Sequence, residues 1–466
     1  MKPWIRIGWA SGLAAAALVA LMTVMASTNS RAVDQSAAAV APSAGNKLIM
    51  HEWGTFTSFS GSNGVQLDFR PLINEDLPDF VFDRRMQAGV PNLTKGRIRA
   101  QIRMETPVTY FYTDEERTIR AKVGFPNGLL TEFYPPVVAM SPPYDSAKDY
   151  SRAFDNSSLD WGEIDLIPVS KLVPNVKDER TRTWLHRIIQ ERVTPTEGSY
   201  NHYYYARETD SAYVHLRHSP SPDLPEFGSD HLEKFLFYRG VGKFEQPLRA
   251  VIASDDVIRV TNTGDQPIRS LFRVTVAKKT IEFSTIAEVP AGASAEFPTM
   301  TTPIQLPELQ QKVVEALVAE KLYPKEAAAM VKTWADSWFA EEGTRIFYMV
   351  PREATDKLLP LTISPPPDES VRVLVGRVEV MSPTMEKQLT EVVQAHALRR
   401  IEWWKQEPAP KQQREPLPIP AELLKLGRLA EPALVRIREL AKDNAIANEA
   451  STLLHECRVA VEKAGT

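Results

Sequence analysis

The chain has 466 residues, of which 43% are hydrophobic, and it carries a formal net charge of −4. Acidic and basic residues are interspersed, so the sequence lacks the basic stripe of a nucleic-acid-binding protein, and we expect no nucleic-acid partner. Its single cysteine, Cys457, excludes an intramolecular disulfide and a thiolate metal cage.

The first 32 residues have the three parts of a secretory signal. Basic Lys2 and Arg6 precede an uncharged apolar run at 13–26, and small residues suited to signal peptidase follow. We therefore predict that residues 1–32 are a signal peptide and that the mature protein is extracytoplasmic, either periplasmic or secreted. The uncharged stretch 7–26 is long enough to span a bilayer, so an uncleaved N-terminal anchor is the alternative and would be the chain's membrane contact.

The next part of the chain predicts β structure. Residues 33–46 are small, polar and aperiodic, which is typical of a flexible leader. From 47 to about 300, short runs rich in β-branched and aromatic residues alternate with turn residues, which predicts antiparallel sandwich-type sheets. Among the predicted strands are 48–56, 118–125, 129–134 and 203–205. The strand spacing is most regular over 246–300, and this segment resembles an Ig-like module.

Residues 301–406 mix helix and strand patterns. Apolar stripes predict a helix around 309–317 and a second helix that starts at Pro324, and a third helix is expected over 384–404. The runs 344–350 and 371–380 return to the strand pattern. We therefore predict an α/β segment here.

The C-terminal part predicts a separate helical unit. Residues 407–420 hold five prolines and are typical of a semi-rigid linker. Residues 421–466 resemble a single HEAT-type helical repeat, which cannot bury a solenoid core by itself, so we expect it to dock on the body or on a partner. A chain that ends after Glu407 is accordingly expected to fold. The predicted fold class is mainly β, with an α/β segment and a small C-terminal α-helical domain.

Four phrases resemble a family of uncharacterised exported bacterial proteins. They are HEWGTFTSF at 51–59, METPVTYFYT at 104–113, EKFLFYRGVG at 233–242 and KTWADSWFAEEGTRIFYMVP at 332–351. The resemblance extends from His51 to about Pro383. It implies a shared fold and assigns no activity.

The first two phrases supply the candidate catalytic residues His51, Glu52 and Glu105. On a strand, alternate residues share a face, so His51 and Glu52 are expected to point to opposite faces. A β-bulge near Gly54 would be needed to bring them to one ion. The alternative is that His51 is an ordinary sheet side chain with satisfied nitrogens.

The middle of the chain is rich in histidine. Four of the eight histidines lie within thirty residues: His202, His215, His218 and His231. Because imidazole is a common ligand of transition metals, we predict that His51, His215 and His218, with Glu105, surround one divalent metal ion. Glu132 or Glu208 would be an alternative carboxylate ligand. No HExxH motif is present, and hydrogen bonding within the sheet is the competing interpretation.

The same region is rich in aromatic residues: Tyr200, Tyr203, Tyr204, Tyr205, Tyr213 and Trp161. Tyrosines that alternate on a sheet can stack on sugar rings, although such residues also pack well in sheets. Three functions therefore remain open. They are an exported metal-dependent enzyme, a carbohydrate- or envelope-binding module with a tyrosine-rich face, and a scaffold that binds a protein partner through its helical tail.

Overall fold

The computed structural model describes residues 41, 43–69, 77–78, 80–83, 100–142, 156–172, 202–216, 231–254, 257–298, 303–406 and 415–464. The predicted signal peptide lies outside these ranges. Within them, no helix has both the length and the apolar character needed to cross a membrane.

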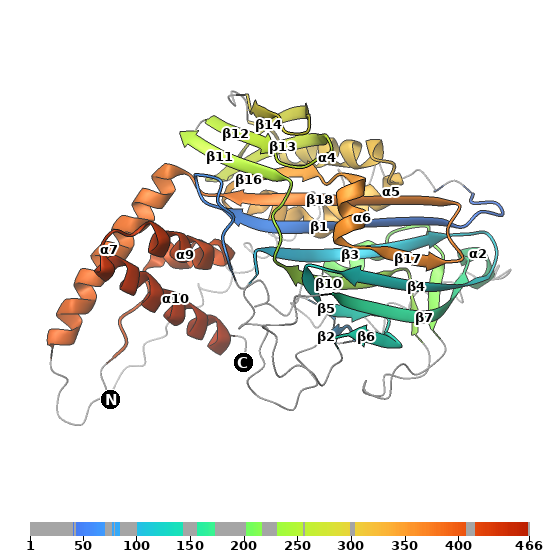
Figure 1. The fold of residues 1–466 in the computed structure, drawn as a ribbon, viewed down its shortest axis with the longest axis horizontal. Helices are drawn as coiled ribbons and strands as arrows, with labels where there is room; N and C mark the ends of the chain where they lie inside the picture. The colour runs from blue at the N-terminus through green and yellow to red at the C-terminus, as the bar shows by residue number, and fades with distance from the viewer. Residues whose placement is uncertain are drawn as a thin grey trace, which may run out of the picture.

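A nine-stranded sheet forms the centre of the body (Figure 1). Its central pair, β1 and β18, is parallel, and every other neighbouring pair is antiparallel. In spatial order its strands are β14 (Thr280–Val289), β13 (Ile268–Ala277), β16 (Gly343–Met349), β18 (Glu369–Val380), β1 (Ile49–Ser60), β3 (Ile102–Tyr112), β10 (Leu236–Gly242), β5 (Gly128–Tyr134) and β2 (Phe82–Asp83).

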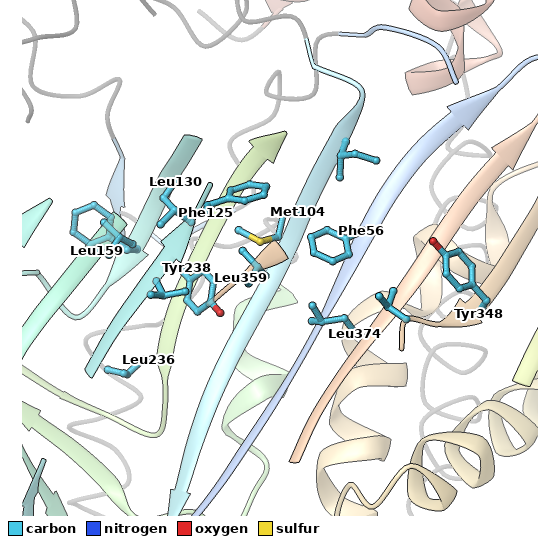
Figure 2. Close-up of a cluster of buried hydrophobic side chains, with 14 of the residues drawn as sticks. Phe56, Met104, Phe125, Leu130, Leu159, Leu236, Tyr238, Tyr348, Leu359 and Leu374 are labelled. Carbon is cyan, nitrogen blue, oxygen red and sulfur yellow. The ribbon is translucent and has the colours of Figure 1, made fainter. Parts of the chain in front are cut away.

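Two smaller sheets share a hydrophobic core with one face of the large sheet. That core includes Phe56 and Met104 of the large sheet, Trp161 of the second and Val260 of the third, and Figure 2 shows part of it. The second sheet contains β17 (Leu361–Ser364), β4 (Arg117–Phe125), β7 (Ser157–Ile167), β8 (Tyr213–Leu216) and β9 (His231–Glu233), with β6 (Ala139–Ser141) paired to β7. The third contains β11 (Leu248–Ser254), β12 (Val257–Asn262) and β15 (Ser294–Glu296).

Helices cover the opposite face of the large sheet. Trp53 and Tyr110 of the sheet pack there with Leu317, Met330 and Trp338 of the helices. The covering helices are α4 (Leu306–Ala319), α5 (Pro324–Ala335), the π-helical turn η4 (Asp336–Ala340) and the 3₁₀ helix η3 (His202–Arg207). Two further short helices are α2 (Val169–Leu172) and α6 (Arg352–Leu358).

The C-terminal helices dock on the body. A third core cluster joins Phe59, Phe69 and Met381 of the body to Leu423 and Leu434 of the tail, which we define as α8 to α10 and the residues between them. The core of the tail is therefore continuous with that of the body. The elements are α7 (Pro383–Lys405), α8 (Ala421–Leu424), η5 (Gly427–Leu429), α9 (Ala430–Leu440) and α10 (Asn444–Ala464).

The predicted fold class, mainly β with C-terminal helices, is confirmed. The structure nevertheless divides the expected Ig-like segment 246–300, because β13 and β14 belong to the nine-stranded sheet whereas β11, β12 and β15 form their own sheet. The segment 301–406 is also not separate from the β body, since β16 and β18 lie inside the large sheet. Which sheet a strand joins depends on its pairing with strands that are distant in the sequence. Local periodicity carries no information about that pairing.

The last part of the expected leader is held against the body. Ala44 is buried, and the carboxylate of Asp114 accepts hydrogen bonds from the hydroxyl of Ser43 at 2.5 Å and the amide of Gly45 at 2.7 Å. Residues 43–45 are thus anchored, in contrast to the flexible leader predicted from composition.

Candidate functional site

Strand β1 sends His51 and Glu52 to different cores of the molecule. His51 lies on the face that packs against α5, and Glu52 lies on the face shared with the smaller sheets, beside Tyr238. The expected alternation therefore holds, and the two side chains do not converge on one ion.

A β-bulge does occur at this point, but in the neighbouring strand. Trp53 pairs with Val108 and Thr55 pairs with Glu105, so β3 has one residue more than β1 between these pairs. The extra residue lies at Thr106–Pro107, where Thr106 has a φ of 43°. Gly54 faces the bulge, and a Cβ atom at this position would lie 2.9 Å from the Cα of Pro107. Because the bulge reverses the alternation of β3, it puts Glu105 on the helix-covered face of the sheet.

His51 belongs to a buried network centred on Glu326 of α5. The imidazole Nδ1 lies 2.8 Å from Glu326 Oε2, and the Tyr112 hydroxyl donates to Glu326 Oε1 at 2.7 Å. The backbone N–H of Tyr323 also donates to Oε2 at 2.7 Å, which completes a capping box at the start of α5. The Tyr323 ring lies 4.4 Å from the imidazole, between ring centroids.

These contacts determine which nitrogen of His51 carries the proton. A carboxylate accepts hydrogen bonds, so we assign the proton to Nδ1, while the buried Nε2 has no hydrogen-bond partner among the described residues. Burial, followed by the negative charge of Glu326, raises the pKa of Tyr112 well above its usual value. Tyr112 therefore stays a neutral donor, and the network holds α5 on β1 and β3.

Glu52 is the centre of a second buried network. Its carboxylate accepts hydrogen bonds from the Tyr238 hydroxyl at 2.5 Å, the Thr109 hydroxyl at 3.0 Å and Arg372 Nε at 2.7 Å. Arg372 also binds Asp356 of α6 at 2.7 Å. Each neighbour compensates the charge or the hydrogen-bonding capacity of Glu52, so this network links β1, β3, β10, β18 and α6.

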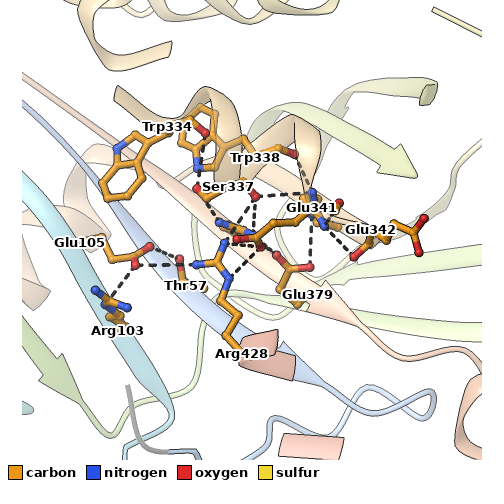
Figure 3. A network of polar contacts seen from close by, with 12 residues as sticks. Thr57, Arg103, Glu105, Trp334, Ser337, Trp338, Glu341, Glu342, Glu379 and Arg428 are labelled. Atoms are coloured by element: carbon orange, nitrogen blue, oxygen red, sulfur yellow. Dashed lines mark hydrogen bonds and ion pairs between the residues drawn. The ribbon is translucent and has the colours of Figure 1, made fainter. Parts of the chain in front are cut away.

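Glu105 belongs to a third network, on the other side of the bulge (Figure 3). Its carboxylate accepts a hydrogen bond from the Thr57 hydroxyl at 2.8 Å and lies 3.0 Å from Arg103 Nε. Arg428 of the tail approaches to 4.0 Å. Burial by itself would raise the pKa of Glu105, but the surrounding guanidinium groups, Arg103 foremost, hold this pKa below its usual value.

Three arginines of this third network bind the end of the helix that continues from α5. Arg345 donates to the carbonyl oxygen of Trp338 at 2.8 Å, and Arg377 donates to that of Ser337 at 2.8 Å. Arg428 donates to the carboxylate of Glu341 at 2.7 Å. Cations are favourable at a helix C-terminus, where the last carbonyl groups lack partners within the helix. The network therefore closes the π-helical turn and attaches the tail to it.

Glu379 is the acidic partner of two of these arginines. It forms an ion pair with Arg377 and receives a hydrogen bond from Arg345 Nε at 3.2 Å. Burial would raise the pKa of Glu379, yet the neighbouring arginines, Arg377 first, lower this pKa to about 2. Burial and the other guanidinium groups lower the pKa of Arg377 to about 10, so it remains charged at neutral pH.

The structure does not bring together those predicted metal ligands that lie in its described residues, His51, Glu105 and His215. His215 lies on β8, where its register partners are Asp165 and Leu232 of the second sheet, whereas His51 and Glu105 belong to the separate networks described above. In the ranges that the structure covers, no group of three or more His, Cys, Asp or Glu side chains is placed to hold a metal ion. His218 lies outside the described residues.

The alternative carboxylates and the remaining histidines have other surroundings. Glu208 forms an ion pair with Lys332 at 2.7 Å, and Glu132 accepts a hydrogen bond from Thr131. His202 begins the 3₁₀ helix η3, and buried His231 lies on β9 beside the ring of Tyr134.

The tyrosine-rich region is not a flat sheet face. Residues 203–205, expected as a strand, lie in η3, and Tyr200 lies outside the described residues. Tyr203, Tyr213 and Trp161 are buried. The Tyr203 hydroxyl donates to Glu233 at 3.1 Å, and the indole N–H of Trp161 donates to the Pro135 carbonyl oxygen at 2.9 Å. Packing accounts for these three aromatic side chains.

Helix α7 presents an apolar surface that the sequence analysis missed. On the C-terminal half of α7, Leu398 is 61% exposed, Ile401 is 47% exposed and Trp404 is 64% exposed. A groove of about 640 Å³ runs beside this part of α7 and is lined by Leu398, Ile401, Trp403 and Leu417, with Arg399, Glu402 and Gln406. In Figure 1 this half of α7 extends away from the β sheets. The i, i+3 spacing of Leu398, Ile401 and Trp404 was the available sequence signal.

Comparison with known proteins assigns no family. No family model matches the chain, and no curated protein matches it. Among solved structures, the Fcho1 mu-homology domain of Danio rerio with a bound Eps15 peptide is 6% identical over 72% of this chain and 96% of its own, with a TM-score of 0.23. The yeast delta-COP-I mu-homology domain is 8% identical over 72% and 96%, with a TM-score of 0.22. The same domain with a bound Dsl1 WxWxV peptide is 8% identical over 72% of this chain and 97% of its own, also with a TM-score of 0.22. TM-scores this low carry no argument about this chain.

Sequence reasoning also missed the partners of the predicted site residues. Glu326 and Arg372 complete the networks of His51 and Glu52. Arg377 lies near Glu105 and pairs with Glu379. The signal for each was a charged residue inside an apolar pattern, as in VRVLVGRVEV. Charges at such positions need buried partners, but the sequence does not show which residues provide them.

Proposed function

We propose that this protein is an exported scaffold that binds an apolar segment of a protein partner in the groove beside α7. The observation that carries the proposal is the groove beside α7, where Leu398 and Ile401 are 61% and 47% exposed. A contiguous exposed apolar surface with a polar rim is typical of an interaction site. The extracytoplasmic location rests on the signal-like residues 1–32.

The polar networks favour a structural role for the HEWG and METP phrases. His51, Glu52 and Glu105 are each at most 1% exposed, and each has a charged partner within 3.0 Å. Buried charges that satisfy one another orient strands and helices. Support for a binding function therefore comes from the groove beside α7 and not from these residues.

A partner protein suits the groove better than a second copy of this chain. A stable interface between two folded proteins buries roughly 800 Å² on each side. Three exposed apolar side chains on two turns of α7 supply only part of that area. A groove of about 640 Å³ instead suits a few large side chains of a peptide segment or helix.

The chain's own linker and an anionic membrane are less suitable occupants. Residues 407–414, EPAPKQQR, contain no large apolar side chain that would fill the groove. The rim carries both signs of charge, because Arg399 accompanies a Glu402–Lys405 ion pair with a separation of 2.8 Å. Such a rim matches a partner with mixed charges and provides little attraction for an anionic lipid surface.

A peptide titration tests the proposal. The probe is a synthetic amphipathic helix with Leu and Trp on one face and Lys and Glu on the other, and a scrambled peptide of the same composition is the reference. We expect saturable binding of the amphipathic helix to the full chain by calorimetry. The double variant Leu398→Ser/Ile401→Ser should weaken binding at least tenfold, because both side chains line the groove.

A matched control variant distinguishes binding in this groove from non-specific binding to exposed apolar side chains. Leu424 and Leu440 are 60% and 42% exposed but do not line the groove, so Leu424→Ser/Leu440→Ser should bind the probe as the wild type does. Equal weakening by both double variants would overturn the proposal. So would groove-dependent binding to vesicles that contain anionic lipid in place of peptide binding, or a dimer in sedimentation that the Leu398→Ser/Ile401→Ser variant dissociates.

A further inference from the structure

One wall of the groove is a short extended segment that contacts α7 at two points. The indole N–H of Trp403 donates to the carbonyl oxygen of Glu415 at 2.9 Å, and Nε2 of His396 lies 3.1 Å from the carbonyl oxygen of Pro418. Leu417, which lines the groove, lies between these two attachment points. The position of this wall therefore depends on His396.

His396 faces a hydrogen-bond acceptor at each ring nitrogen. Its Nδ1 lies 2.6 Å from Glu449 Oε1 on α10, and its Nε2 faces the Pro418 carbonyl oxygen. The side chain is 2% exposed, so water does not readily replace either contact. A neutral imidazole has one N–H group, whereas an imidazolium has two. Both contacts are therefore hydrogen bonds only when His396 is protonated.

The carboxylate of Glu449 that faces His396 also has a cationic neighbour. Arg400 of α7 binds Glu449 at 2.7 Å and Glu456 of α10 at 2.8 Å, and Glu415 of the wall segment contributes its backbone carbonyl group.

We propose that protonation of His396 fastens the Pro418 end of the groove wall to α7, and that this end loosens as pH rises. As a control of partner binding, this inference rests on the proposed function. On deprotonation the remaining N–H group stays with Glu449, because a hydrogen bond to a carboxylate is stronger than one to a neutral carbonyl group. The lone pair of Nε2 then faces the oxygen of Pro418. The contact becomes repulsive, and Leu417 loses its fixed position.

The test follows three signals of the full chain during one pH titration. They are the imidazole nitrogens of His396 by NMR, the indole N–H signal of Trp403, and the affinity for the amphipathic helix probe. We expect all three to change with the same midpoint, and the affinity to fall about fivefold, the equivalent of one lost hydrogen bond. In His396→Gln the latter two signals should lose this midpoint. His455→Gln changes an exposed histidine of α10 and should behave as the wild type does.

The outcomes distinguish this inference from the proposed function. If the probe never binds but the Trp403 signal follows His396, the docking proposal fails and the pH-dependent wall stands. If His396 titrates without a change at Trp403, the wall does not depend on its protonation and the inference is wrong. It is also wrong if the midpoint persists in His396→Gln.

Discussion

His51 and Glu52 are adjacent in the chain, yet each organises a different core. The pleat of β1 directs one to Glu326 and the other to Arg372. Each carboxylate in these networks accepts hydrogen bonds from several donors. Removal of the carboxylate leaves those donors buried and unpaired, and this cost exceeds the net gain from any single hydrogen bond.

Glu326 provides the clearest test at this scale. Glu326→Ala would leave His51 Nδ1, the Tyr112 hydroxyl and the Tyr323 amide without their acceptor. We expect the free energy of unfolding to fall by about 3 kcal/mol, measured by urea denaturation. As a control, Glu308→Ala changes an exposed acid of α4 whose ion-pair partner, Lys312, is also exposed, and little change is expected. Equal effects of the two substitutions would show that the Glu326 network contributes no stability.

Glu379 makes the free energy of unfolding depend on pH in the acidic range. Its pKa of about 2 in the folded protein lies below the ordinary value of 4.5. As pH falls, the unfolded chain therefore binds this proton first. The stabilisation is fully present above pH 4.5 and is lost towards pH 2, by up to roughly 3 kcal/mol.

Urea denaturation between pH 6 and pH 2 checks this prediction. Glu379→Gln should be less stable than the wild type at neutral pH, because Arg345 and Arg377 lose their anionic partner. It should also lose less stability on acidification. Glu288→Gln, at an exposed ion pair with Arg269, should keep the wild-type slope. A wild-type slope in Glu379→Gln would contradict the assignment.

At the scale of elements, both apolar and polar contacts attach the tail to the body. Its helices bury Phe59 and Phe69 of the body, and Arg428 reaches the π-helical turn after α5. Arg436 of α9 donates to Glu386 at 2.8 Å, and Glu386 accepts a hydrogen bond from the amide of Ser62 at 2.9 Å. These contacts make the tail part of the main structure, although a proline-rich linker precedes it.

Truncation after Glu407 should therefore not leave an intact body, in contrast to the expectation from composition. We expect an insoluble protein or the loss of a cooperative unfolding transition, because apolar residues of the third core cluster become exposed. Recovery of a soluble truncated chain with the wild-type melting temperature would show that the tail is dispensable for folding.

A point substitution in the full-length chain measures how much the core between the tail and the body contributes to stability. Leu434 of α9 is 0% exposed, and Leu434→Ala should lower the free energy of unfolding by about 2–5 kcal/mol in urea denaturation. Leu440→Ala, at a residue that is 42% exposed on the same helix, should cost much less. Similar values for the two variants would indicate that the tail core contributes little stability.

At the scale of the whole molecule, one large sheet organises three cores. The helices cover one face, the smaller sheets share a core with the other face, and the tail adds the third cluster. The anchored residues 43–45 enter this assembly at Asp114. Eight residues, 33–40, separate the end of the predicted signal peptide from Ala41, whose amide donates to Asp210 at 2.9 Å.

Export is tested on the whole protein. We expect the mature N-terminus to lie between Ser27 and Asp34, because the motifs Val-Met-Ala at 24–26 and Ser-Arg-Ala at 30–32 both suit signal peptidase. N-terminal sequencing of the protein from the envelope fraction measures this directly. Intact Met1 in the membrane fraction would establish the uncleaved anchor instead.

Local sequence patterns determined much of the secondary structure. Alternation predicted strands close to β1, β4, β5 and β18, and apolar stripes predicted α4, α5 and α7, because both signals depend on neighbours within a few residues. The same alternation separated His51 from Glu52. The predicted strand over 203–205 was wrong, since a run of tyrosines also fits a 3₁₀ turn that packs on α5.

Tertiary structure decided how those pieces combine. The parallel pairing of β1 with β18 joins Ile49 to Glu369, and no local pattern encodes a contact over that separation. The same pairing brings Arg372 to Glu52, and the packing of α5 brings Glu326 to His51. A histidine or carboxylate in an apolar strand reveals that it needs a partner. Whether that partner is a metal ion or another side chain depends on which distant elements the fold brings beside it.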